Sequence, residues 1–148
     1  MSAKALWDAY CSATGFDGPQ PDCDQFGDTQ ELGDELLALV QKGIKRATCC
    51  LARDFSTLDR PKAGDHWIIT DGRGRAACIV KTTQTELVRI CDVTAEFAYT
   101  EGEGDKTLVY WKREHDAYFT RQATREGFTY DDKMIGICET FEKVWPHD

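Results

Sequence analysis

The sequence predicts an α+β domain in which a small β-barrel is flanked by α-helices. Amphipathic helical patterns at residues 29–42 and 106–123 stand on either side of several short apolar and β-branched runs, and one more such run follows at residues 135–141. Strands with open edges tend to pair with other chains, so closure of these strands into a barrel with helices at its sides is expected.

The first long helix is predicted at residues 29–42. Leu32 and Leu36 recur at helical spacing, and Gly43 stands where a helix commonly ends. Asp28 is expected to be the N-cap, with a glutamate three residues later as its capping-box partner.

The second long helix is predicted at residues 106–123, with Asp105 as its cap. Its aromatic residues, which include Trp111, recur at three- and four-residue steps, and such a stripe usually faces a core. Near the start of the chain, residues 6–11 are expected to form a short helix and residues 15–27 a surface loop rich in Gly, Pro and Asp.

Short runs of apolar and β-branched residues predict the strands. The Asp-Gly-Arg-Gly run at residues 71–74 is a hairpin turn signal between two of them. The predicted strands lie at residues 47–51, 66–70, 75–83, 86–90 and 135–141.

Length and composition suit one domain over residues 1–148, with 41% hydrophobic residues to form a core. No apolar run reaches the roughly 18 residues that a membrane span needs, and the start of the chain lacks the pattern of a secretory signal. We therefore expect a cytoplasmic protein without a membrane partner. The seven cysteines, an odd number without any Cys-x-x-Cys pair, are expected to be reduced thiols.

The net charge of −8 is unevenly distributed. Residues 1–40 carry one lysine and eight acids, residues 41–90 ten Lys or Arg and five acids, and residues 91–148 seven and thirteen. A basic middle segment in an acidic chain can concentrate positive potential in one place, which suits a short single strand or a nucleotide better than a long duplex. The alternative is that these charges scatter over the surface.

Three segments, in order, carry a resemblance to a known family. Gly-Ile-Lys-Arg-Ala-Thr at residues 43–48 matches a Gly-x-Lys-x-x-Thr motif directly after a helix, and Pro-Lys-Ala-Gly-Asp at residues 61–65 resembles a turn before a strand. The acidic, Gly-containing residues 96–105 precede a helix with Trp111 and His115. Over about residues 28–144 the chain resembles the ASCH domain family.

The resemblance implies a PUA-like β-barrel with a cleft between barrel and helices, and a role linked to RNA. Members of the family are known as RNA-binding modules and as ribonucleases. A branch with shorter chains removes the acetyl group from acetylcytidine by amide hydrolysis.

Lys45, Thr48 and Glu101 are the candidate catalytic residues. A lysine at the edge of a cleft can neutralise a phosphate or, if desolvated, transfer a proton. A threonine hydroxyl can orient a substrate or act as a nucleophile, and it also suits any strand. The resemblance aligns Glu101 with the acidic catalytic position of the amidohydrolase branch. On a regular strand Lys45 and Thr48 would face opposite sides, so they converge only if the turn after the first helix persists or a bulge intervenes.

Further residues are candidates for contact with a nucleic acid beside Lys45. Tyr99 and Trp111 can stack on an unpaired base, although core packing is the alternative for Trp111. Arg46, Arg75 and Thr120 are candidates for phosphate contact. The expected partner is single-stranded RNA, a nucleotide or a nucleoside; the sequence does not predict an oligomeric state.

Glu103 and Asp105 are candidate magnesium ligands, because carboxylate oxygens suit this hard cation. The alternative is a solvated acidic loop with a helix cap, so no metal or cofactor is firmly predicted.

Three functions follow from these residues. The first is a ribonuclease that cleaves single-stranded RNA in a basic cleft around Lys45. The second is an amidohydrolase that deacetylates acetylcytidine-type nucleosides with Thr48, Lys45 and Glu101, for which overall acidity is no handicap. The third is an RNA-binding module without catalysis.

Overall fold

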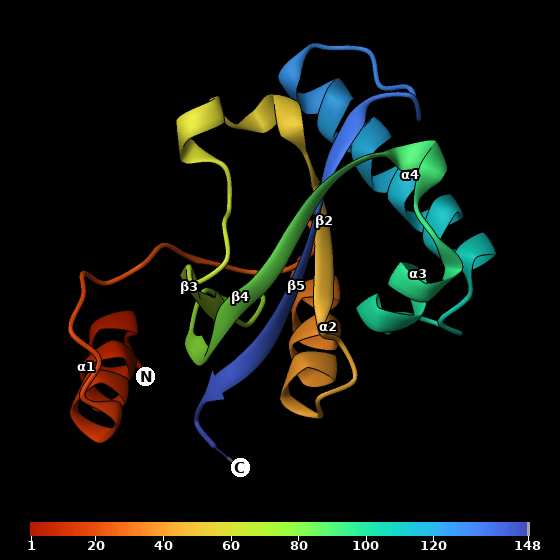
Figure 1. Ribbon diagram of the computed structural model, residues 1–148. Helices are drawn as coiled ribbons and strands as arrows, with labels where there is room; N and C mark the ends of the chain where they lie inside the picture. Colours follow the sequence, from red (N-terminus) through yellow and green to blue (C-terminus); the bar gives the residue numbers. More distant parts are fainter. Residues whose placement is uncertain (148) are drawn as a thin grey trace.

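Five strands form one open sheet in the order β1-β3-β4-β5-β2 (Figure 1). The computed structural model describes residues 1–147 of the chain. All neighbouring strands are antiparallel except β1 and β3, which are parallel. The strands are β1 Cys23–Asp24, β2 Ala47–Leu51, β3 His66–Thr70, β4 Ala76–Arg89 and β5 Ile135–Trp145.

Helices cover both faces of this sheet. Figure 1 shows α1 on one side and α3 with α4 on the other, beside β2. The α-helices are α1 Ala3–Thr14, α2 Gln30–Gln41, α3 Ala95–Glu101 and α4 Leu108–Glu126. Short 3-10 helices η1 Ala52–Asp54, η2 Thr57–Asp59 and η3 Ile90–Asp92 lie in the connections.

The alternation of β3 and β4 side chains places apolar groups on both faces. Ile68 and Ile79 pack with α1, whereas Ile69 and Val80 pack with α2. A third cluster joins α3 and α4 to β2 through fully buried residues such as Leu51. Burial on both faces explains why these strands read as nearly continuous apolar runs in the sequence.

The α+β class is confirmed, but a closed barrel is not observed. In the described part of the chain, β1 pairs only with β3 and β2 pairs only with β5, so the sheet remains open. One edge strand, β1, is only two residues long and lies within the stretch expected to be a loop, and a very short edge strand limits pairing with other chains without closure.

The predicted helices and strands are confirmed with shifted ends. The first long helix has Thr29 as its N-cap, because its side chain accepts a hydrogen bond from the backbone of Leu32. Asp28, expected as the cap, instead binds Arg121 of α4. The second long helix starts at Leu108 rather than residue 106, because Lys106 has a positive φ of 66° that a helix does not allow.

Two sequence runs that were expected to be separate strands form one. Residues 75–83 and 86–90 belong to the 14-residue β4, and the irregularity between them is a register shift against β5 between Thr82 and Gln84. Such a shift increases the local twist without ending a strand. None of the seven cysteines forms a disulfide within residues 1–147.

Candidate functional site

The turn after α2 directs Lys45 inward. Gly43 has a φ of 75°, which reverses the chain, and the backbone N–H groups of Ile44 and Lys45 both donate to the carbonyl of Leu39. Arg46 is then fixed by backbone hydrogen bonds, one of them to Thr100 of α3 at 3.0 Å. The turn therefore persists up to the start of β2, as convergence of Lys45 with Thr48 requires.

The end of α3 brings two carboxylates to the same place. Gly102 ends the helix with a φ of 73°, and a Cβ at this position would overlap with the backbone carbonyl of Ile44. This close approach of two backbones lets Glu101 and Glu103, on either side of the glycine, both reach the Lys45 ammonium. A glycine is required here by both the φ and the contact.

Lys45 is buried, with 2% of its surface exposed, and all three of its N–H donors are used. Its Nζ donates to the carbonyl of Ala47 at 2.8 Å, to Oε1 of Glu101 at 2.9 Å and to Oε2 of Glu103 at 2.7 Å. A lysine ammonium has three donors, so no free donor remains for a phosphate. The expectation of Lys45 as an open phosphate contact is therefore corrected.

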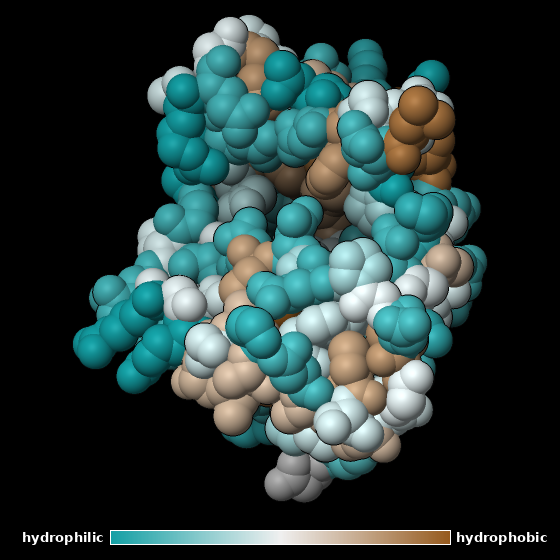
Figure 2. Space-filling view, turned by 90° about the vertical axis from the view of Figure 1, so that its left-hand side faces the viewer, coloured by the Kyte–Doolittle hydropathy of each residue, from teal (hydrophilic) through white to brown (hydrophobic). Residues whose placement is uncertain are grey.

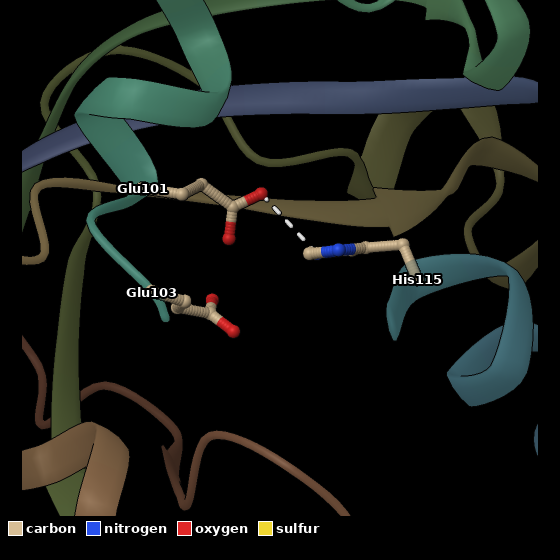
Figure 3. Close-up of side chains that lie close together, drawn as sticks. All are labelled: Glu101, Glu103 and His115. Atoms are coloured by element: carbon tan, nitrogen blue, oxygen red, sulfur yellow. Dashed lines mark ion pairs between the residues drawn. The ribbon is translucent and has the colours of Figure 1, made fainter. Parts of the chain in front are cut away.

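The second oxygen of Glu101 is held from α4. The indole N–H of Trp111 donates to Oε2 at 2.5 Å, and Nε2 of His115 lies 3.3 Å from the same atom (Figure 3). The His115 ring stacks on the Trp111 ring with centroids 3.9 Å apart, and its Nδ1 donates to the Trp111 carbonyl at 2.9 Å. Glu101 is thus fixed on both oxygens.

The charges within this group shift each other's pKa. Burial by itself raises the pKa of Glu101, but the charges of Lys45 and His115 outweigh it and hold that pKa well below its usual range. Burial lowers the pKa of His115, but the Glu101 carboxylate outweighs this effect and raises it overall. Burial and the neighbouring Glu101 raise the pKa of Glu103 against the pull of Lys45. Of the two carboxyls beside Lys45, Glu103 therefore holds a proton more readily than Glu101 does.

Glu101, Glu103 and His115 place potential metal-ligand atoms within 4.8 Å of one another (Figure 3). One oxygen of each carboxylate already binds the Lys45 ammonium, so a cation bound here would lie next to that positive charge. The carboxylate of Asp105 accepts hydrogen bonds from Thr107 just before α4 and is exposed. The donor set therefore fits an ion-pair network better than the magnesium site for which Glu103 and Asp105 were candidates.

This network lines a cavity of about 390 Å³ between α2, α4 and β2. A second cavity of about 840 Å³ shares several of its walls, among them Thr48 and Trp67. Figure 2 shows the molecule hollowed above its middle, with hydrophilic residues around the opening. The Thr48 hydroxyl makes no hydrogen bond with any residue among 1–147, so it is available to a bound molecule. The aromatic walls of the first cavity are Phe26, Phe55, Trp67, Tyr110, Tyr118 and Phe119.

The cavities are acidic, not basic as expected. Beside Lys45, which is already paired, the only other Lys or Arg on the described walls is Arg121, whose guanidinium binds Asp28 at 2.7 Å and 3.1 Å. The carboxylates on the walls are those of Asp22, Asp24, Asp54, Asp59, Asp65, Glu101, Glu103, Glu114 and Glu139.

Apart from Lys45, the residues expected to contact a nucleic acid do not line either cavity. Tyr99 is 58% exposed on α3, beside Lys106, and Trp111 is 2% exposed in the core, where it offers no face to a base. Arg46 and Arg75 are exposed, and Arg75 pairs with Asp71 at 2.6 Å. These positions are separate surface features, so the expected set does not form one site.

Thr120 also lies apart from the other expected residues. Its hydroxyl donates to the carbonyl of Asp116 on the outside of α4. Sequence reasoning in turn missed the contact of His115 with Glu101, although the family resemblance had included His115. Its spacing of four from Trp111 on one helix was the signal, because residues so spaced lie on the same face.

The model of the ASCH domain family matches residues 22–145. The chain belongs to the ASCH domain family. The match extends slightly beyond the region of resemblance inferred from the motifs. No curated protein matches the chain. The family is proposed to bind RNA.

Solved structures share the fold of this ASCH domain. Protein EF3133 of Enterococcus faecalis V583, which carries the DUF984 family model, is 32% identical, with a TM-score of 0.88 over 96% of this chain and 87% of that one. An ASCH domain of Lactobacillus crispatus JV V101 is 24% identical, with a TM-score of 0.85 over 95% and 92%. The hypothetical protein PH0355 is 14% identical, with a TM-score of 0.52 over 83% and 99%.

Within residues 1–147, no helix combines the length and the apolar character that crossing a membrane requires.

Proposed function

We propose that this ASCH domain is an amidohydrolase that removes the acyl group from an N-acylated nucleoside of the acetylcytidine type. The observation that carries the proposal is the unpartnered Thr48 hydroxyl in a cavity that also contains Glu103 and is walled by aromatic rings. A cavity of about 390 Å³ is within the usual range for a small ligand, and flat aromatic walls suit a nucleobase.

The charge of the walls supports this substrate over a phosphodiester. The carboxylates on the cavity walls would repel a polyanion. The Lys45 ammonium cannot offset them, because all of its donors are used by Ala47, Glu101 and Glu103. A neutral nucleoside needs no counter-charge, and its amide groups can donate to carboxylates. The ribonuclease hypothesis required an available cation in the cleft, so the geometry supports it less well.

Each residue has a distinct role in the proposed reaction. The Thr48 Oγ attacks the acyl carbon, and its proton passes to a neighbouring carboxylate. The C–N bond breaks as protonated Glu103 gives its proton to the departing amine. Water then loses a proton to Glu103 and attacks the acyl–Thr48 ester, and Oγ regains its own proton as the acid leaves. Lys45 holds Glu101 and Glu103 in place.

Acetate release from acetylcytidine by the purified protein tests the proposal. We expect wild type to release acetate, Thr48→Ala to lose about a thousandfold or more in kcat/KM, and Thr48→Ser to stay within about tenfold of wild type. Thr120→Ala is the matched control, because this hydroxyl lies outside both cavities and should leave the rate unchanged.

Labelled single-stranded RNA incubated with the same preparations separates the competing functions. Cleavage by wild type that is lost in Lys45→Ala, without any acetate release, would replace the amidohydrolase by the ribonuclease. RNA binding that weakens with rising salt and has no turnover would instead identify a binding module.

A further inference from the structure

Glu139 is a buried carboxylate that the residues around Lys45 do not involve. It lies on β5 directly opposite Thr48 of β2 in the antiparallel register. Side chains of such a pair lie on the same face of the sheet, with Cβ atoms about 5 Å apart. Both residues line the second cavity, and Thr48 also lines the first. Thr48 therefore shares the first cavity with Glu103 and the second with Glu139.

Only one of the two Glu139 oxygens has a partner within residues 1–147. Its Oε1 accepts a hydrogen bond from the hydroxyl of Thr82, and no described residue donates to Oε2. The residue is 6% exposed, and His66 is the only residue on the described walls of the second cavity that can carry a positive charge. Oε2 is not one of the buried side-chain atoms that lack a partner, so it is open to the cavity, where it can accept a proton.

We propose that Glu139 is a further catalytic residue, the general base that takes the proton of the Thr48 hydroxyl. This inference rests on the proposed function, because it supplies the carboxylate that accepts the nucleophile's proton. The hydroxyl of Thr82 holds Oε1, which leaves Oε2 to accept the proton from the Thr48 Oγ as that oxygen bonds to the acyl carbon. When the acyl–Thr48 ester is hydrolysed, the proton returns from Glu139 to Oγ.

In this proposal Glu103 and Glu139, which lie in different environments, each carry out one of the proton transfers. Glu103 lies beside the Lys45 ammonium in the first cavity, where it serves the departing amine. Glu139 lies in the second cavity, where burial raises its pKa and makes it a stronger base toward a hydroxyl than an exposed glutamate. The register of β2 and β5 thus places a base beside the nucleophile without any contribution from α3 or α4.

Reaction of Thr48 with a small fluorophosphonate tests the inference apart from any substrate. In this reaction Oγ bonds to phosphorus, fluoride leaves and the proton goes to the base, so the rate reports activation of the hydroxyl whether or not acetylcytidine is cleaved. We expect mass spectrometry to find Thr48 labelled in wild type, and labelling about a hundredfold slower in Glu139→Gln. The glutamine keeps an acceptor for Thr82.

Glu142→Gln is the matched control, because Glu142 is an exposed glutamate on the same strand, and its labelling rate should equal that of wild type. Chemical unfolding of each variant verifies that Glu139→Gln is folded at the assay temperature. An unlabelled Thr48 in folded wild type, or equal labelling of folded wild type and Glu139→Gln, would overturn the role of Glu139. Absence of acetate release despite labelling would overturn the proposed function alone.

Discussion

Lys45 is not positioned to bind a phosphate. Its ammonium is enclosed by one backbone carbonyl and two carboxylates, and one of these carboxylates is itself held by Trp111 and His115. A buried charge of this kind is tolerated only because its partners compensate for the lost hydration. The motif around Lys45 therefore organises the site, and the Thr48 hydroxyl is the group there that has no hydrogen-bond partner among residues 1–147.

Replacing Lys45 by methionine is expected to destabilise the protein by about 3–5 kcal/mol, because it leaves the buried Glu101 carboxylate without its ammonium. Urea unfolding measures the change. Adding Glu101→Gln to the same variant should recover part of the loss, since the uncompensated charge is then removed as well.

Lys42→Met is the control for that series. Lys42 is exposed, so its replacement should change the free energy of unfolding by no more than about 0.5 kcal/mol. Equal effects at Lys42 and Lys45 would mean that the network around Lys45 contributes nothing to stability.

At the scale of elements, periodicity predicted most of the fold. The strands at residues 47–51 and 66–70 have the predicted bounds, and α2 differs by one residue at each end. Local capping was less predictable, because Asp28 and Thr29 are both good caps and only the contact with Arg121 decides between them. The open sheet was not predictable at all, because closure depends on which strands meet over long distances rather than on any local pattern.

The candidate site was also only partly predictable, because part of it depends on long-range strand pairing and not on a local pattern. The sequence pattern named Lys45, Thr48 and Glu101, and it weighed Glu103 only as a metal ligand. The proposed role of Glu139 depends on the register between β2 and β5, which no local pattern specifies. For Trp111 the alternative of core packing is the one observed, and the predicted contact of the exposed Tyr99 with a base stays a prediction.

Gly102 connects two elements of the site, and its replacement by alanine tests that connection. We expect Gly102→Ala to cost about 3 kcal/mol in unfolding free energy, about 1 from the positive φ and the rest from overlap with Ile44. Gly127→Ala is the matched control, because Gly127 also ends a helix at positive φ but has open space around it, and its cost should be about 1 kcal/mol. Equal costs from denaturant unfolding would show that the contact between α3 and the Lys45 turn is not tight.

At the scale of the whole molecule, the net negative charge of the chain is also found on the walls of the two cavities. The basic residues of the middle segment lie mostly on the surface, where Arg75 pairs with Asp71, while carboxylates line both cavities. A cleft of this sign repels a phosphate backbone and admits a neutral nucleoside. The alternative that the basic residues scatter over the surface is therefore the one observed, because a count by segment does not say which side chains face inward.

The most direct test of the account is to search for an acylated enzyme. Wild type mixed with acetylcytidine, quenched within a turnover and analysed by peptide mass spectrometry should carry one acetyl group on Thr48, and Thr48→Ala should carry none. Acetate release by wild type with no acetyl group on Thr48, at a rate that Thr48→Ala reproduces, would contradict the account.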